Sequence, residues 1–214
     1  MAFITDPRKI EARSFQIVDK YLTNIKLSAL EKEVMKRVLH ATSDLNYIGD
    51  IVFHPKAIRN GIASIRKWKD IIVDALMVKA GINKKLVSKF GGKVICLINK
   101  KDVVRQASRS NITRAILAMR KARKSMEGGI VAIGNAPTAL FEVCDLVSIG
   151  VGAEPALIIG LPVGFVGAKE AKKKLRALNV PYITNRSRHG GSSAAAACLN
   201  AMLKIAEREK RKDA

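Results

Sequence analysis

Acidic and aromatic residues are scarce in this sequence. Of its 214 residues, 18 are Asp or Glu against 39 Lys or Arg, which gives a formal net charge of +21, and aromatic side chains make up only 5%. A positive charge of this size is typical of a protein that binds nucleic acid or a small ligand with many carboxylates. The low aromatic content and the lack of a recognised DNA- or RNA-binding motif make nucleic acid the less favoured partner.

Cysteine is scarce as well. The three cysteines, Cys96, Cys144 and Cys198, lie far apart in the sequence and each is surrounded by apolar residues. A disulfide framework or a zinc knuckle needs closer or paired spacing, so this pattern predicts core thiols in a reducing compartment.

Long hydrophobic runs are missing. No apolar stretch approaches the ~20 residues of a membrane span, and the N-terminus lacks the order of basic, apolar and small residues that marks a signal peptide. We therefore predict a cytoplasmic protein that does not associate with a membrane.

What the chain does contain is a clear strand–turn–helix pattern near its middle. Ile130–Ile133 is apolar and partly β-branched, as in a parallel strand that is covered on both faces. Gly134 and Asn135 tolerate unusual backbone angles, and Pro137 suits the first turn of a helix. Ligands bind at such strand ends in open α/β sheets, so we expect Asn135 and Thr138 to face a site. An ordinary βα loop produces this local pattern about as often.

Similar apolar segments alternate with helical patterns along the rest of the chain. We predict strands at 70–78, 92–98 and 130–133, in the apolar run after Glu154, and at 180–184. Helices are predicted at 17–22, from Ser28, and at 55–67, 102–126 and 138–148. A further helix should follow the Gly/Pro-rich turn after the fourth strand and end at about residue 178, and the last helix should begin at Ala194. Five strands that alternate with helices indicate one α/β domain over residues 1–214 with a doubly wound parallel sheet. Residues 1–27 are expected to pack on this domain, and residues 207–214 to form a frayed basic tail.

The helix that begins at Ser28 carries a histidine near its end. Ser28 and Glu31 form a capping box, and Leu30, Val34, Val38 and Ala41 continue an apolar stripe. His40 falls off this stripe. An isolated histidine in that position is more often a surface residue than a catalyst.

Two local features depart from the regular pattern. Asp74 interrupts the first expected strand, and because a buried carboxylate is costly unless it is paired, we expect a polar cluster there. Between Lys100 and Lys124 there are nine basic residues against one acid, Asp102. A solvated helix face is the commonest explanation of such a run.

Glycine-rich segments follow three of the expected strands. Their functional candidates are Asn135 and Thr138, Gly164 and Phe165, and Arg188, Gly190, Gly191 and Ser192. Since the carboxyl ends of parallel strands lie at one edge of a sheet, these residues should gather into a small-molecule site. The second segment is not a nucleotide P-loop, because no Gly-Lys-Ser/Thr follows at the required spacing.

Taken together, these segments resemble the precorrin-8X methylmutase family of the corrin pathway, which includes cobalt-precorrin-8 methylmutase. The longest shared motifs are IGNAPTAL at 133–140, GLPVGFVGA at 160–168 and HGGS at 189–192. Shorter ones are RSF at 13–15, VLHA at 38–41, DALMV at 74–78 and TR at 113–114. The resemblance runs in colinear order over nearly the whole chain.

This resemblance implies an isomerase that moves a methyl group from C-11 to C-12 of a corrin macrocycle by a sigmatropic shift. It implies no cofactor and no metal site. It also implies a three-layer, flavodoxin-like fold and a homodimer whose sites lie near the subunit interface. The substrate is a tetrapyrrole polycarboxylate, with or without cobalt.

The resemblance also assigns roles to residues. His40 corresponds to the family's functional histidine, which would protonate the ring system or hold its proton during migration. Arg114 corresponds to the family's arginine, whose guanidinium suits a peripheral carboxylate. The full set of expected substrate-binding residues is Arg13, Ser14, Asp74, Met77, Thr113, Arg114, Asn135, Thr138, Gly164, Phe165, Arg188, Gly190, Gly191 and Ser192. Gly134, Gly164, Gly190 and Gly191 are expected to admit the edge of the macrocycle close to the backbone.

Two positions depart from the family's usual pattern. The chain has Trp68 where the turn before the first strand usually contains a glycine, and Ser187-Arg188-His189 where Gly-Arg-Arg or Gly-Arg-Leu is more usual. Two other functions stay open: a corrinoid carrier without turnover, which would not need His40, and a basic α/β protein that binds nucleic acid.

Overall fold

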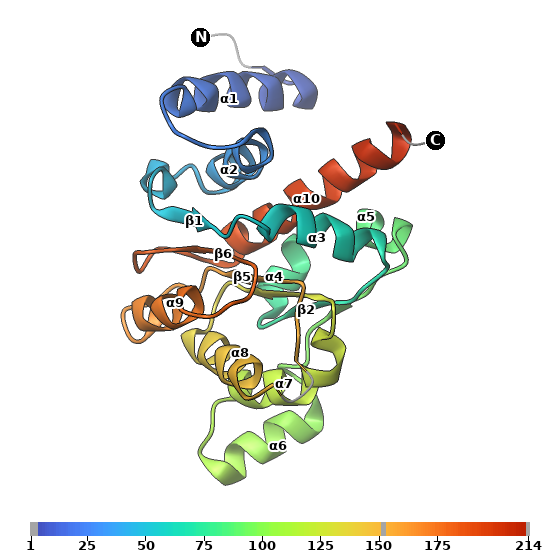
Figure 1. The fold of residues 1–214 in the computed structure, drawn as a ribbon, viewed down its shortest axis with the longest axis vertical. Coiled ribbons are helices and arrows are strands. Elements are labelled where there is room, and N and C mark those ends of the chain that lie inside the picture. The colour runs from blue at the N-terminus through green and yellow to red at the C-terminus, as the bar shows by residue number, and fades with distance from the viewer. Residues whose placement is uncertain (1–3, 151–152, 213–214) are drawn as a thin grey trace.

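A six-stranded sheet lies at the centre of the computed structural model, which describes residues 4–150 and 153–212 (Figure 1). The strands are β1 (Ile51–Phe53), β2 (Ile71–Val73), β3 (Val94–Ile95), β4 (Ile130–Ile133), β5 (Leu157–Gly160) and β6 (Tyr182–Asn185). Their order is β1-β6-β5-β4-β2-β3, and all neighbours are parallel except β1, which pairs antiparallel with β6. The predicted doubly wound sheet is confirmed, with one strand more than expected. The order of its parallel strands is flavodoxin-like.

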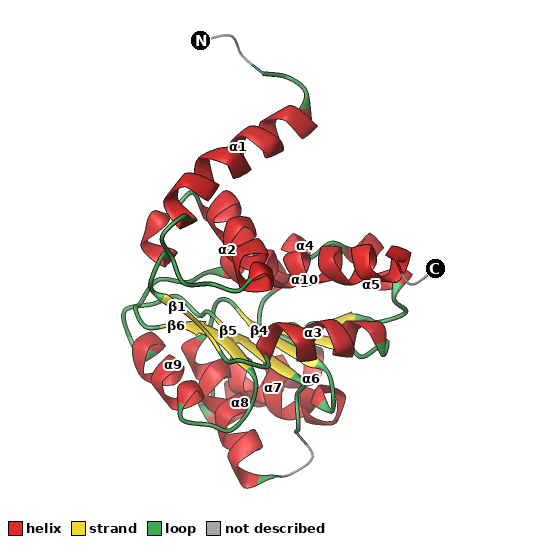
Figure 2. Ribbon diagram, turned by 45° about the horizontal axis from the view of Figure 1, so that its top comes forward, coloured by secondary structure: helices red, strands yellow, loops and turns green. Residues whose placement is uncertain are grey.

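Helices cover both faces of this sheet (Figure 2). One face carries α3 (Ala57–Arg66), α4 (Leu76–Gly81), α5 (Lys84–Lys89) and α10 (Ser192–Lys212), with α2 (Ala29–Thr42) packed on α10. The other face carries α7 (Arg114–Ala122), α8 (Pro137–Ile149) and α9 (Ala168–Arg176). At the two ends of the molecule lie α1 (Pro7–Leu22), outside α2, and α6 (Lys101–Ser110), outside α7 (Figure 1). None of the described helices is long and apolar enough to cross a membrane.

Each central strand therefore contributes side chains to two hydrophobic cores. In β4, Ile130 and Ala132 pack in the core that contains α3 and α10, whereas Val131 and Ile133 pack in the core that contains α7 and α8. All four side chains are buried. This burial on both faces explains why the strand is apolar throughout instead of alternating with polar residues.

Two cysteines lie in these cores, as predicted. Cys198 lies on α10 and Cys144 on α8, one in each core, and burial raises the pKa of both thiols to about 12. Both therefore stay protonated near neutral pH. Cys96 is only half-buried.

The helix boundaries predicted from capping signals are confirmed. At the start of α2, Ser28 Oγ accepts from the Glu31 N–H (3.4 Å) while the Glu31 carboxylate accepts from the Ser28 N–H (2.8 Å). At the start of α8, Pro137 occupies the first turn, where its missing N–H costs no intrahelical bond.

Both terminal helices are longer than predicted. A short helix was expected at 17–22, but α1 begins at Pro7, where the Asp6 carboxylate caps the N–H of Arg8. The frayed tail expected from Glu207 is also wrong within the described residues, because α10 continues to Lys212. Side-chain pairs hold this last part of the helix on the body: Glu207 with Lys89 (2.6 Å) and Arg208 with Glu33 (2.7 Å).

Two long elements predicted from periodicity are each divided in the structure. The strand expected at 70–78 ends at Val73, and α4 begins at Leu76, after a bend of the chain at Asp74 and Ala75. The helix expected at 102–126 is three elements: α6, α7 and the 3-10 helix η2 (Arg123–Met126). Asn111 adopts a left-handed conformation (φ 53°) that ends α6, and the Thr113 side chain caps α7.

Several short elements were missed or displaced. The edge strand β1 and the helix α5 were not predicted, and β6 begins and ends later than the expected 180–184. β1 has only three residues and exists because it pairs with β6, opposite Ile183, Thr184 and Asn185. Such a tertiary pairing leaves little trace in local periodicity.

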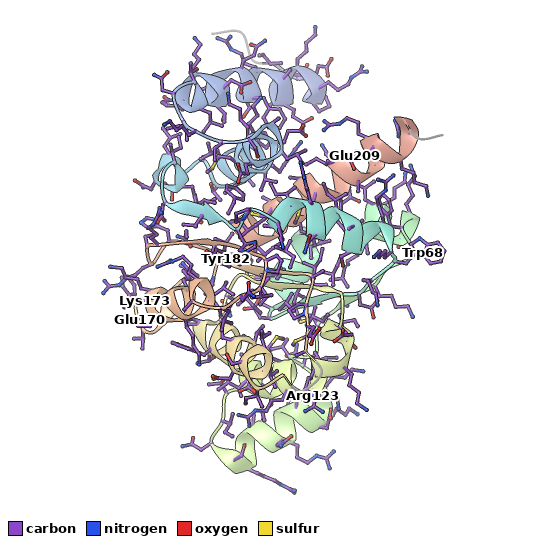
Figure 3. All side chains as sticks on the ribbon, viewed as in Figure 1. Trp68, Arg123, Glu170, Lys173, Tyr182 and Glu209 are labelled. Atoms are coloured by element: carbon purple, nitrogen blue, oxygen red, sulfur yellow. The ribbon has the colours of Figure 1, made fainter. Side chains whose placement is uncertain are left out.

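Trp68 occupies a backbone position that favours glycine. It lies in the turn between α3 and β2 with φ 59°, and its side chain is 71% exposed at the edge of the molecule (Figure 3). Only glycine adopts this left-handed conformation without a steric cost from Cβ. The structure therefore gives a physical reason for the glycine that the family usually has there.

Trp68→Gly should stabilise the protein. A left-handed backbone costs an L residue ~1–2 kcal/mol, and the greater chain entropy of unfolded glycine offsets ~0.5–1 kcal/mol of the gain. The free energy of unfolding in urea should therefore rise by up to about 1.5 kcal/mol. Trp68→Ala is the matched control, because alanine keeps the strain. An equal gain with alanine would show that backbone strain is not the cause.

Candidate functional site

The carboxylate of Asp74 organises the edge of the sheet where β2 and β4 end. It is 1% exposed and accepts hydrogen bonds from three consecutive backbone N–H groups of the turn after β4: Gly134 (3.0 Å), Asn135 (2.9 Å) and Ala136 (2.7 Å). The order of the parallel strands reverses between β2 and β4, and ligands of doubly wound proteins bind at this point. The expected polar cluster at Asp74 is thus present.

These bonds change the role expected for the turn and for Asp74. The N–H groups of such a turn can bind an anionic ligand when they are free, but here they donate to Asp74, so the turn is not an open anion site. Burial raises the pKa of Asp74, while the three N–H donors oppose that effect because they stabilise the charged form. Asp74 was expected to bind substrate. Both of its oxygens instead hold the turn that presents Asn135.

The loops after β4, β5 and β6 meet at this same edge, as predicted. The Gly164 N–H donates to the Arg188 carbonyl (3.4 Å), and the Gly191 N–H donates to the Leu161 carbonyl (2.9 Å). A Cβ on Gly134 would lie 2.8 Å from the Cα of Ser192. The edge therefore brings together three of the segments that the resemblance singles out.

The first turn of α7 joins this edge from the other side. Thr113 Oγ1 lies 3.3 Å from Thr138 Oγ1, and the Arg114 guanidinium donates to the Asn99 side chain (3.3 Å). Two large apolar side chains nearby stand out into solvent: Met77, in the first turn of α4, is 74% exposed, and Phe165, in the loop after β5, is 89% exposed. Exposed apolar groups at a strand-end edge are available to a ligand or to another subunit.

The glycines at this edge do not all leave space for a ligand. A Cβ on Gly190 would lie 2.4 Å from the Leu161 carbonyl oxygen, and the space beside Gly134 is filled by Ser192 and Val78. At these two positions glycine permits close packing of the loops, because a Cβ there would meet other atoms of the protein. Gly164 has an open side, but its φ of 154° disfavours any other residue.

A separate cavity of about 620 Å³ lies between α1 and α2, and His40 is one of the residues that line it. Arg13, Ser14 and His40 all line it. The Nδ1 atom of His40 is 2.7 Å from Ser14 Oγ, and its ring packs edge-on against Phe15 at a centroid distance of 5.4 Å. The cavity volume is in the range typical of small-molecule sites, ~300–1,000 Å³.

The rest of this cavity is apolar and open to solvent. Its exposed apolar residues are Ile4, Ile10, Ile17, Tyr21 and Leu45. A row of exposed apolar side chains along one helix is uncommon in a monomer and typical of a surface that is covered by a ligand or a partner.

The α1–α2 cavity and the strand-end edge are connected but distinct. None of the residues lining the cavity comes from the strand-end loops. The connection runs through the end of α2 and the 3-10 helix η1 (Leu45–Tyr47): Asp44 pairs with His189 (3.3 Å), and the buried Tyr47 hydroxyl donates to the Gly190 carbonyl (3.0 Å). Tyr47 was not predicted as part of the site. Its only sequence signal is an aromatic residue in a polar loop.

No group of three or more His, Cys, Asp or Glu side chains is placed to hold a metal ion within residues 4–150 and 153–212.

Comparison with known proteins identifies the family. A model of the family described as precorrin-8X methylmutase matches residues 9–205. The chain belongs to this family. It is 44% identical to the cobalt-precorrin-8 methylmutase of Priestia megaterium, over 94% of this chain and 89% of the relative. It is 37% identical to the precorrin-8X methylmutase of Pseudomonas aeruginosa, over 94% of this chain and 96% of the relative.

A solved structure supports the same assignment. The crystal structure of the precorrin-8X methylmutase from Thermus thermophilus matches with a TM-score of 0.87 and 38% identity, over 94% of this chain and 97% of that chain. The resemblance inferred from the sequence is thus confirmed at the level of family and fold. In this methylmutase, the unusual His189 provides the pair with Asp44 that joins α2 to the strand-end edge.

Asp74→Asn should destabilise the methylmutase by about 2–3 kcal/mol, because charge-assisted hydrogen bonds are worth ~1.5–3 kcal/mol and an amide cannot accept all three N–H groups. Urea denaturation measures this change. Asp70→Asn is the control at the other end of β2, since that carboxylate accepts from the Lys93 N–H at a more exposed position (3.2 Å). Similar losses for both variants would mean that the turn does not depend on Asp74.

Proposed function

We propose that this protein is a corrin-ring methylmutase, an isomerase that moves a methyl group from C-11 to C-12 of precorrin-8X or cobalt-precorrin-8 in cobalamin biosynthesis. The observation that carries the proposal is the match to the family over residues 9–205, together with relatives named for each of the two substrates. The placement of His40 in an apolar cavity that also contains Arg13 supports it. The three thiols are free, which suits a reducing cytoplasm.

His40 is the proposed proton donor. Its Nδ1 atom is engaged by Ser14, so Nε2 is the ring nitrogen left to exchange a proton with the macrocycle. In the imidazolium form, Nδ1–H donates to Ser14 Oγ while Nε2–H protonates the ring system. The proton returns after the methyl group has moved, so the isomerisation uses no net proton. Neither step requires a redox or nucleotide cofactor.

Three arginines are proposed to bind the peripheral carboxylates of the substrate. None of Arg13, Arg114 and Arg188 pairs with a carboxylate among the described residues, in contrast to Arg37, which pairs with Glu11, and Arg120, which pairs with Glu142. An exposed guanidinium that is not paired with a carboxylate of the protein can bind a ligand carboxylate in bidentate geometry. The walls of the pocket are proposed to be Asn135, Thr138, Thr113, Met77, Gly164, Phe165, Gly190, Gly191 and Ser192.

The site is proposed to form between the two subunits of a homodimer. In one chain, His40 and Arg114 belong to different parts of the surface, and both parts carry exposed apolar side chains such as Ile17 and Phe165. In a two-fold dimer, any contact between one surface of a subunit and a second surface of its partner occurs twice, once in each direction. Docking of the α1–α2 surface near a partner's strand-end edge would cover the apolar side chains and bring His40 to the strand ends.

His40→Ala should abolish turnover while leaving the fold intact. General acid catalysis supplies ~10²–10⁴-fold in rate, so conversion of precorrin-8X, or of its cobalt analogue, to the rearranged chromophore should fall by about that factor. Absorbance spectroscopy of the purified protein with either substrate measures this, and wild-type turnover tests the proposed function itself. A wild-type protein that binds the tetrapyrrole without changing its spectrum would be a carrier.

Ser14→Ala is the companion variant for His40. It removes the partner of Nδ1 but keeps the imidazole, so kcat should fall by about tenfold, less than with His40→Ala. Turnover of His40→Ala within a few-fold of the parent would rule out His40 as the essential donor.

Mixing two inactive variants tests the shared site. If His40 and Arg114 of one site come from different subunits, a heterodimer of His40→Ala and Arg114→Ala contains one intact site and one doubly substituted site. Random exchange of an equal mixture should therefore restore about a quarter of wild-type activity. Each variant after exchange with itself is the control. No recovery, with heterodimers verified by mass spectrometry, would place both residues in the same subunit's site.

A further inference from the structure

The loop that presents Arg188 is held in place through nearly every carbonyl it contains. We call residues 186–191 the Arg188 loop. The carbonyl of Arg188 accepts from the Gly164 N–H, and that of Gly190 accepts from the Tyr47 hydroxyl. The carbonyls of Ser187 and His189, on either side of Arg188, both accept from the ammonium group of Lys172. The guanidinium of Arg188 itself is exposed and makes no ion pair with a described residue.

Lys172 reaches this loop from inside the protein. It lies on α9 and is 0% exposed, among the largest fully buried side chains of the described residues. Its Nζ donates to the Ser187 carbonyl at 3.0 Å and also to the His189 carbonyl. One ammonium group therefore fixes the backbone immediately before and immediately after Arg188.

Asp50 and Asn185 hold the same loop from the side of β1 and β6. The Asp50 carboxylate accepts from the N–H groups of Arg186 (2.8 Å) and Ser187 (3.0 Å) and from the Ser187 hydroxyl (2.5 Å). The Asn185 amide donates to Asp50 (2.7 Å) and to the His189 carbonyl (3.0 Å). Lys172 and Asn185 thus share one acceptor, and the loop is fixed from two sides.

This arrangement is costly for a purely structural role. No carboxylate contacts Lys172 within hydrogen-bonding distance in the described part of the chain, and burial lowers its pKa to about 8, although the charge of Asp50 opposes that effect. A hydrophobic side chain of similar length would fill the space without desolvating an ammonium group. What a hydrophobic side chain cannot do is fix two carbonyls at defined positions. The burial of Lys172 is therefore best explained by the geometry of the loop.

We propose that Lys172 and Asp50 are positioning residues that clamp the Arg188 loop and thereby fix Arg188 for a carboxylate of the substrate. The part that concerns the substrate rests on the proposed methylmutase function. The clamp itself does not, because it can be measured without substrate.

The clamp is tested by hydrogen exchange on the full-length protein. In Lys172→Met, the amides of Ser187, His189 and Gly191 should exchange at least about tenfold faster, while amides in β4 and α8 keep their parent rates. Lys173→Met is the matched control: Lys173 is the next residue of α9 and its side chain lies at the surface (Figure 3). Unchanged exchange in the Arg188 loop of Lys172→Met would overturn the proposal.

The link to Arg188 is tested by kinetics with precorrin-8X. Lys172→Met should raise KM at least about tenfold with kcat within about threefold of the parent, since loss of a carboxylate contact removes binding shared by the ground and transition states. The double variant Lys172→Met/Arg188→Ala should be no worse than Arg188→Ala alone, because both changes remove the same interaction. Additive effects would overturn this link.

A second variant covers the case in which Lys172→Met does not fold. Asp50→Asn acts from the opposite side of the loop and should give the same pattern of faster loop exchange, raised KM and non-additivity with Arg188→Ala. Parent-like exchange and KM in Asp50→Asn would count against the clamp. If the wild-type protein turns over neither precorrin-8X nor its cobalt analogue while the loop amides loosen only in the clamp variants, the proposed function fails and the clamp stands.

Discussion

The three hydrogen bonds that Asp74 accepts across the ends of β2 and β4 are the contact on which the strand-end edge depends. They fix the turn from Gly134 to Ala136, and that turn sets where α8 begins and how closely the start of α10 can approach. The loops after β5 and β6 pack on the same region. A carboxylate buried at this point is expensive to desolvate, and the three N–H groups offset that cost only while the turn keeps its shape. The turn and the carboxylate therefore stabilise each other.

This internal use of N–H donors decides how a polyanionic ligand can be recognised. Many doubly wound proteins bind phosphate with the free N–H groups of a turn after a strand. Here those groups donate to Asp74, so in the proposed site the negative charge of the ligand is bound by side chains. Arg13, Arg114 and Arg188 come from three separate elements, which suits a wide ligand with carboxylates spread around its rim better than one compact anionic group. The dispersed arginines and the turn without free N–H groups thus both favour a wide ligand with several carboxylates over one compact anion.

The sequence was informative wherever local pattern and fold agreed. The strand at Ile130–Ile133, the capping box at Ser28 and the gathering of the glycine loops all follow from local composition and from the geometry of parallel sheets. The break at Asn111 was missed because the apolar stripe continues on both sides of it, and β1 was missed because its pairing with β6 is tertiary. Lys172 did leave a signal: it lies on the same helix face as Ala168 and Leu175, so a charged residue sits on an apolar stripe. The separation of His40 from the strand ends had no local signature, since it depends on how α1 and α2 leave the body.

Trp68 has an optical consequence. It is the single tryptophan of the chain, and it lies in the turn before β2, at the amino end of the strands, whereas Asp74 and the strand-end loops lie at their carboxyl end. A chromophore bound at the carboxyl edge would not touch the indole, yet a corrin absorbs in the near ultraviolet, where tryptophan emits. In the proposed complex, Trp68 would therefore be a built-in donor for resonance energy transfer, and its fluorescence would report a bound macrocycle by distance alone, with no label and no change to the residues proposed to hold the ligand.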